Sequence, residues 1–217
     1  MAMGRIRSRH AETYLGLVWW VLTPLLLGSV YLIVFGTIFN TARGDPNYIG
    51  FLLSGLFAFV YTSSSLNSGA SSILQNARLV TTQSFPRLIL PIASLVEGAA
   101  GFLFSLIPLV FIAGFAAGDW PGVYTLLLIP TFILHTLFNL GLTALVGILT
   151  IPFRDITNVL PMITRIWLYT SPVIFALDAR LKNASETLYT ILSFNPLVSI
   201  LGMYRAAILG RELETAH

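Results

Sequence analysis

Few side chains in this chain of 217 residues could carry out chemistry. Cysteine is absent, which excludes disulfides, thiolate metal sites and cysteine nucleophiles. The three histidines, His10, His135 and His217, are too scattered to suggest a metal site by their spacing. No Gly-x-x-x-x-Gly-Lys-Ser/Thr phosphate loop occurs, and Lys182 is the only lysine. The sequence therefore predicts a protein that is not an enzyme, with no metal or cofactor of its own.

Several strongly polar residues stand within long apolar stretches. Glu97 is one, and an unpaired charge there costs at least about 2.5–3.5 kcal/mol to insert into a membrane. It is either a pore-facing or subunit-interface carboxylate, or a structural group bonded to Ser94 or a serine of 63–65. A proton carried by Glu97 would make a proton-coupled carrier the minor alternative. His135, one turn from Asn139, is expected to hydrogen-bond between helices.

The composition predicts an all-α membrane protein. The chain is 56% hydrophobic and 10% charged, with a mean hydropathy of +0.83, whereas soluble domains carry about 25% charged residues. A bilayer core of ~30 Å needs ~20 apolar residues as a helix. Five stretches meet that length, which predicts a bundle of five clear transmembrane helices. They are residues 17–39, 48–72, 88–117, 123–151 and 156–177.

The ends of the chain differ from these spans. Residues 1–14 are basic and lead into aromatic residues, so they predict an amphipathic interfacial helix. The apolar run that follows is too long for a signal peptide, whose core has ~7–15 residues. The moderately apolar segment 187–210 is interrupted by Asn195-Pro196 and Arg205, and predicts two short re-entrant helices. Arginines in the alternate loops place the N-terminus in the cytoplasm, with six basic residues inside against three in the outer loops.

The loop at 75–87 is the most distinctive segment between the spans. It carries Leu79, Val80 and Phe85 beside Arg78 and Arg87. Apolar side chains next to arginines are typical of a docking surface for a cytosolic partner. The alternative is a segment that lies in the lipid headgroups with its arginines on phosphates.

Several motifs resemble those of one transporter family, in order along essentially the whole chain. The chain is similar to permease subunits of type-2 ABC exporters of O-antigen, capsular polysaccharide and teichoic acids. The residues that carry the resemblance are Tyr14-Leu15-Gly16-Leu17-Val18-Trp19, Asn76-Ala77-Arg78-Leu79-Val80, Phe85-Pro86-Arg87-Leu88, Phe153-Arg154-Asp155, Ser171-Pro172-Val173-Ile174 and Asn195-Pro196-Leu197 with Arg205. The family usually has a sixth spanning helix after the Leu209-Gly210 region, so this chain shows one helix fewer.

The resemblance implies that residues 1–217 form a single transmembrane domain, which works together with separate ATPase subunits. Two permease copies form a pore, and two cytoplasmic ATPase subunits bind ATP and Mg. Residues 75–87 would be the coupling loop, 1–14 the interfacial gate helix and 187–210 the outer gate. The implied coupling residues are Asn76, Arg78, Leu79, Val80, Phe85, Pro86 and Arg87. The implied gate residues are Arg7, Tyr14, Trp19, Asn195, Pro196 and Arg205.

The implied function is export of a lipid-linked polysaccharide or teichoic-type polymer across the cytoplasmic (inner) membrane of a bacterium. The expected partners are membrane lipids, the glycan substrate and the ATPases, with no nucleic acid. A drug or small-lipid exporter permease is the alternative. Aromatic residues could contact sugar rings in the pore, or serve only as belt and core residues. The polar run 62–71 could line the pore or allow close helix packing. The possible pore or interface residues are Glu97, Phe35, Tyr61, Ser64 and Tyr169.

Overall fold

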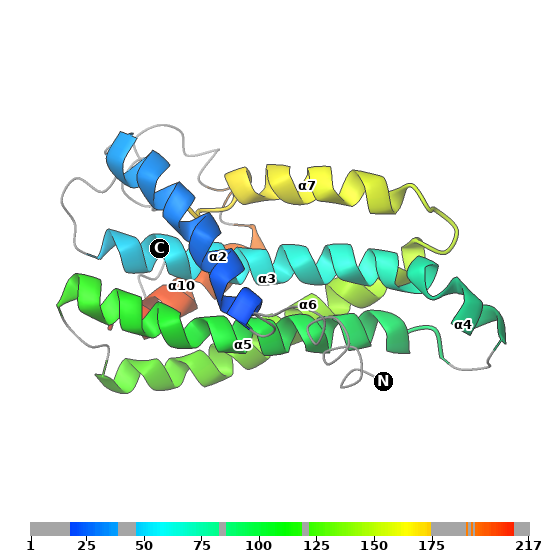
Figure 1. Cartoon of the computed structure of the whole chain (residues 1–217), viewed down its shortest axis with the longest axis horizontal. Helices are drawn as coiled ribbons and strands as arrows, with labels where there is room; N and C mark the ends of the chain where they lie inside the picture. Colours follow the sequence, from blue (N-terminus) through cyan, green and yellow to red (C-terminus); the bar gives the residue numbers. More distant parts are fainter. Residues whose placement is uncertain are drawn as a thin grey trace.

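The computed structural model describes residues 18–38, 47–82, 86–118, 122–174, 190, 192 and 194–210. Throughout these ranges the regular structure is helical and contains no strand, which confirms the predicted all-α class. Figure 1 shows α3 (Tyr48–Gln75) running through the middle of the bundle, with α5 (Ile89–Ala117) and α6 (Leu128–Leu149) beside it. On the other side of α3 lies α7 (Ile156–Thr170), and α2 (Val18–Tyr31) crosses obliquely.

Helix α3 is the core of the molecule. It packs against α2, α5, α6, α7 and the short helix α10 (Pro196–Leu209). Of its most apolar 18-residue window, 72% is buried, against 6% for the first span, which covers α2 and the following π-helix η1 (Leu32–Ile38). Residues Leu52, Leu56 and Phe57 of α3 are each no more than 1% exposed. The bundle is therefore organised around α3, and the first span lies at its surface.

Within the part of the chain that the structure describes, four helical segments are long and apolar enough to cross a membrane. They are Val21–Ile38, Tyr48–Gln75, Ile89–Phe115 and Gly122–Leu149, the last including a 3-10 helix, η2 (Gly122–Leu127). They match the first four predicted spans to within a few residues.

The fifth predicted span, 156–177, is shorter than expected. Helix α7 has 15 residues and is about 22 Å long at 1.5 Å per residue, less than the ~30 Å of a bilayer core. It ends because Ser171 is extended, at φ −90° and ψ 145°, and a residue before proline avoids the helical region. Pro172 follows Ser171, so the apolar run to 177 does not continue α7.

Small residues let α3 approach its neighbours closely. A Cβ atom on Gly69 would overlap the side chain of Thr143 on α6, so any larger residue there requires the two helices or Thr143 to shift. At Gly98 of α5 a Cβ would lie 3.2 Å from the Ser65 hydroxyl of α3. Part of the polar run 62–71 therefore allows close helix packing, which was one of the two roles predicted for it.

Candidate functional site

A groove of about 270 Å³ lies between α2, α3 and α5. Its lining residues recur at helical spacing, so each helix contributes one face. Three residues predicted as possible pore or interface residues, Tyr61, Ser64 and Glu97, lie together in it. The lining also includes Trp19, a predicted gate residue. The full set is Trp19, Thr23, Phe57, Val60, Tyr61, Ser64, Ser68, Ser94, Glu97, Gly98, Gly101, Phe102 and Ser105.

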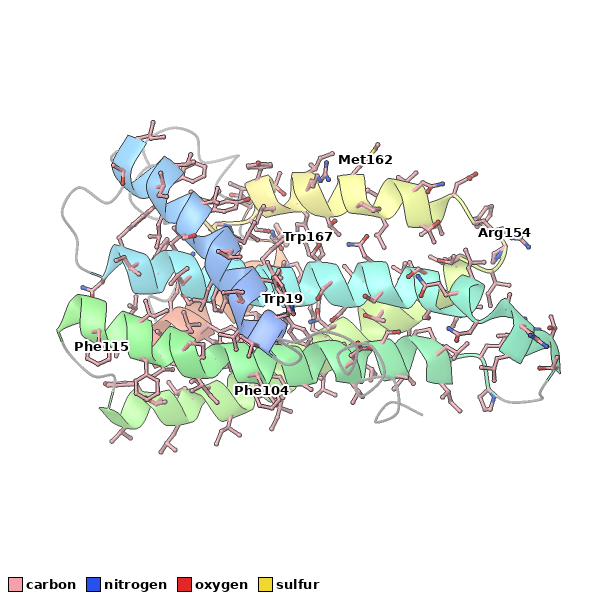
Figure 2. The ribbon with its side chains drawn as sticks, viewed as in Figure 1. Trp19, Phe104, Phe115, Arg154, Met162 and Trp167 are labelled. Atoms are coloured by element: carbon pink, nitrogen blue, oxygen red, sulfur yellow. The ribbon has the colours of Figure 1, made fainter. Side chains whose placement is uncertain are left out.

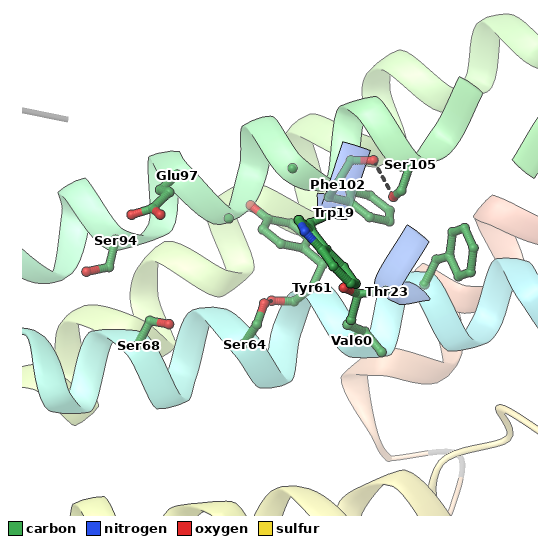
Figure 3. A pocket seen from close by; sticks show the side chains of 13 residues that line it. Trp19, Thr23, Val60, Tyr61, Ser64, Ser68, Ser94, Glu97, Phe102 and Ser105 are labelled. Carbon is green, nitrogen blue, oxygen red and sulfur yellow. Dashed lines mark hydrogen bonds between the residues drawn. The ribbon is translucent and has the colours of Figure 1, made fainter. Parts of the chain in front are cut away.

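The groove has a polar end and an aromatic end, as Figure 3 shows. Ser94 and Glu97 of α5 lie at the polar end with Ser68 of α3. Glu97 is half-buried and lies within the span Ile89–Phe115. Polar side chains at membrane depth are rare and commonly mark a substrate pathway or a helix contact.

The aromatic end is built from Trp19, Tyr61 and Phe102. The rings of Tyr61 and Phe102 are stacked, with centroids 4.9 Å apart and an interplanar angle of 7°. Both side chains are nearly buried, whereas Trp19 is 40% exposed. The aromatic end therefore combines two buried, stacked rings with a more accessible indole.

His135 of α6 supports this wall from behind. Its ring meets Tyr61 edge-on at 4.9 Å and Phe102 at 5.9 Å. Its Nε2 lies 2.7 Å from the Thr62 hydroxyl of α3, and its Nδ1 lies 3.3 Å from the Tyr204 hydroxyl of α10. One neutral imidazole satisfies both contacts, donating through one ring nitrogen and accepting through the other. The interhelical bonding expected of His135 and Asn139 is thus found for His135, which joins three helices. The side-chain amide of Asn139 is buried without a hydrogen bond of standard geometry.

The predicted gate residues Asn195, Pro196 and Arg205 belong to α10 and its N-cap, and Asn195 and Arg205 both contact the segment that follows α7. Asn195 caps α10 through Oδ1, which accepts from the Leu197 amide at 3.1 Å and from the Trp167 indole at 3.2 Å. Pro196 follows as the first residue of α10, where a missing amide proton costs nothing. Arg205 donates to the carbonyls of Pro172 at 2.5 Å and Val173 at 3.0 Å, with its guanidinium 3.5 Å from the Phe51 ring centroid.

The predicted coupling residues that the structure describes lie at one end of the bundle. A six-residue helix, α4 (Ala77–Thr82), projects there beyond α3, as Figure 1 shows. Arg78, Pro86 and Arg87 are exposed, while Leu79 and Val80 are half-buried rather than fully exposed. Asn76 ends α3, and its side-chain amide donates to the Ser72 carbonyl at 2.6 Å. Arg154 lies at the same end of the molecule (Figure 2).

The remaining predicted residues fall elsewhere. Phe35 of η1 stacks on Tyr31 at 5.8 Å. Tyr169 is 63% exposed near the end of α7, where its side chain interacts with Tyr31. Neither lines the groove that contains Tyr61 and Glu97. A second hollow of about 350 Å³ between α3 and α7 includes Ser63, Ser64 and Arg165 in its lining. Arg7, Tyr14 and Phe85 lie outside the described residues, as does most of the first predicted re-entrant helix.

Phe102, Ser105 and Tyr204 were missed by the sequence reasoning. A signal for the first two is present in the sequence, because Ser94, Gly98, Phe102 and Ser105 recur every three or four residues along α5 and so share one face. Nothing comparable marks Tyr204, which meets His135 from 69 positions away in the sequence.

Comparison with known proteins identifies similar chains. No family model matches the sequence. The O-antigen export system permease protein RfbA of Myxococcus xanthus is 28% identical over 211 residues, 97% of this chain and 79% of that protein. Its counterpart from Klebsiella pneumoniae is 26% identical over 96% of this chain and 78% of that protein. The predicted resemblance to type-2 ABC exporter permeases is confirmed. The polysialic acid transport protein KpsM of Escherichia coli is also similar, at 26% identity over 94% of this chain and 78% of that protein.

Proposed function

We propose that this chain is the pore subunit of an ATP-driven exporter that moves a lipid-linked polysaccharide or teichoic-type polymer across the bacterial inner membrane. The observation that carries the proposal is the similarity to O-antigen and polysialic acid permeases over 94–97% of the chain. The four apolar spans fit a membrane-embedded subunit. The chain contains no phosphate loop in its sequence, so ATP hydrolysis belongs to a partner.

The arrangement of charges supports an orientation for this pore subunit. Arg78 and Arg87 flank the end of α3 that also lies near Arg154. Basic loops are retained in the cytoplasm, so this end faces the ATPase and the N-terminus is cytoplasmic. In this proposal two copies of the chain form the pore, and residues 75–87 receive the movement of the two ATPase subunits. Residues 1–14 and 187–210 act as the gates.

Deletion of the gene in its source organism tests the function. The expected result is loss of the surface polymer, with polymer accumulating inside the cell, and recovery when the wild-type chain is restored. Surface polysaccharide is measured by immunoblotting of intact and lysed cells. A drug or small-lipid exporter would leave the surface polymer unchanged and would instead raise sensitivity to its substrate. Unchanged surface polymer after deletion would therefore remove the polymer proposal in favour of that alternative.

A further inference from the structure

Arg165 of α7 places a positive charge inside the membrane. It is exposed, and it shares a hollow with Ser63 and Ser64, which lie within the span Tyr48–Gln75. None of the residues that the structure describes accepts a hydrogen bond from Arg165 or forms an ion pair with it. A charged side chain at this depth is costly, and such groups pair with one another or with other polar groups. Arg165 therefore indicates an anion that comes from outside the described part of the chain.

The hollow beside Arg165 has mostly apolar walls. Its volume is about 350 Å³, and its lining comes from α2, α3 and α7. In Figure 1, α7 runs along one side of α3, and α2 crosses α3 obliquely. The apolar residues of the lining are Leu27, Leu56, Phe59, Val60 and Leu168. Only 6% of the first span, which includes Leu27, is buried, so the hollow lies at the surface of the bundle and suits an alkyl chain.

Three hydroxyl groups complete the lining of the hollow. Ser63 accepts a hydrogen bond from the side-chain amide of Asn67 at 3.4 Å and donates to no residue that the structure describes. Ser64 and Thr164 each donate to a carbonyl of their own helix at 3.1 Å, which leaves the lone pairs of their oxygens for a ligand. The hollow therefore offers donors for a phosphate, at Arg165 and Ser63, together with acceptors for hydroxyl groups.

We propose that this hollow binds an anionic phospholipid of the surrounding membrane, of the phosphatidylglycerol type. The phosphate accepts hydrogen bonds from Arg165 and Ser63, the glycerol hydroxyls of the headgroup donate to Ser64 and Thr164, and an acyl chain lies on the apolar walls. Hydrogen bonds between a guanidinium and a phosphate are charge-assisted and often bidentate, and basic pockets between membrane helices bind anionic headgroups. The ligand is a membrane lipid and not the exported molecule, so this inference goes beyond the proposed function and does not depend on it.

Photocrosslinking locates the lipid on the chain. The full chain, purified in detergent with its ATPase partner, is irradiated with a phosphatidylglycerol that carries a photoreactive group in one acyl chain. Mass spectrometry is expected to find the label on the peptides that contain Phe59 and Leu168. Unlabelled phosphatidylglycerol should compete for this labelling. Phosphatidylcholine with the same acyl chains should compete about tenfold less well, because its choline group offsets the phosphate charge and donates no hydrogen bonds.

Substitution of Arg165 tests the source of this preference. Arg165→Gln removes the charge and should weaken the binding of phosphatidylglycerol about tenfold. Arg165→Lys keeps the charge and should bind more tightly than Arg165→Gln, which distinguishes loss of the cation from damage to the fold. Arg154→Gln is the matched control, since Arg154 is exposed and does not line the hollow. The control variant should retain both the labelling and the preference.

Four outcomes would overturn the inference. The first two are equal competition by the two phospholipids and unchanged labelling in Arg165→Gln. The third is displacement of the lipid by millimolar inorganic phosphate, which would indicate a site for a free anion. The fourth is stronger competition by a polyprenyl phosphate than by phosphatidylglycerol, which would indicate a site for the carrier of the exported polymer. The gene deletion tests the exported substrate separately, so either proposal can fail while the other stands.

Discussion

At the scale of single residues, two polar contacts of His135 join three helices. Thr62, His135 and Tyr204 are all fully buried, and they come from α3, α6 and α10. Within a membrane such bonds contribute about 0.6 kcal/mol on average and up to about 1.7 kcal/mol. The cluster is therefore a modest stabilising element that fixes the position of the Tyr61 and Phe102 rings.

Substitutions that remove one bond each test this cluster. Thr62→Val removes the 2.7 Å contact and Tyr204→Phe the 3.3 Å contact, and both keep the shape of the side chain. We expect each to lower the free energy of unfolding, by up to about 1.7 kcal/mol, with the larger loss for Thr62→Val. Unfolding is measured in detergent micelles by denaturant titration.

The same substitutions are then repeated in a His135→Phe background, where neither bond exists. Their effects should nearly vanish there, because residues in one network are not additive. Tyr124→Phe is the control, as Tyr124 is 41% exposed on η2. Effects of equal size in both backgrounds would show that the two hydroxyls stabilise the fold without His135.

The sequence indicated the polar members of the site better than their neighbours. Glu97 and His135 stand out because polar side chains are rare and costly within an apolar span. Their partners do not stand out, since Thr62 lies 73 positions from His135 and such a pairing depends on how the helices pack. Tyr61, Ser64 and Glu97 were grouped as possible pore or interface residues, and they share one groove, whereas Phe35 and Tyr169 do not.

At the scale of elements, hydropathy was sufficient where a helix is both long and uniformly apolar. Hydropathy did not predict where α7 ends, because an apolar run indicates an apolar environment and does not show that the backbone becomes extended before Pro172. It also could not show that α3 is the central helix, since all of the spans are apolar. The small residues Gly69 and Gly98, which allow close approach, are the nearest sequence signal for that position.

Helix α4 carries the prediction that belongs to this scale. Arg78 of α4 and Arg87, which precedes α5, are exposed, while Leu79 and Val80 of α4 are half-buried, so a charge reversal at the two arginines alters the surface and leaves the packing intact. We expect Arg78→Glu with Arg87→Glu to reduce co-purification of the ATPase at least tenfold, without a change in the amount of chain in the membrane. The bound ATPase is quantified by immunoblotting after affinity purification of the chain.

The matched control for this charge reversal is Arg180→Glu, in a loop that the sequence places on the outer side. It should leave the ATPase association unchanged. Full association of the α4 double variant would contradict the coupling role of residues 75–87. It would favour the other sequence-based interpretation, in which this segment lies among lipid headgroups.

At the scale of the whole molecule, several arginines gather at one end of the bundle. Arg78, Arg87 and Arg154 gather near α4, while α5 leads away from that end and η2 begins at the opposite one (Figures 1 and 2). A helix of 29 residues such as α5 extends about 43 Å, enough to separate the two ends across a bilayer. The positive-inside rule then assigns the α4 end to the cytoplasm.

The absence of cysteine makes this orientation directly measurable, since any single cysteine is the only thiol in the chain. We expect Val123→Cys, at a position 80% exposed near the start of η2, to react with a membrane-impermeant maleimide on intact spheroplasts. Arg87→Cys and Arg154→Cys should react only after the membrane is permeabilised. The opposite pattern would place α4 outside, and no cytoplasmic ATPase could then reach it. Labelling of all three positions on intact spheroplasts would contradict the assignment of α5 as a membrane-crossing helix, because its two ends would lie on one side.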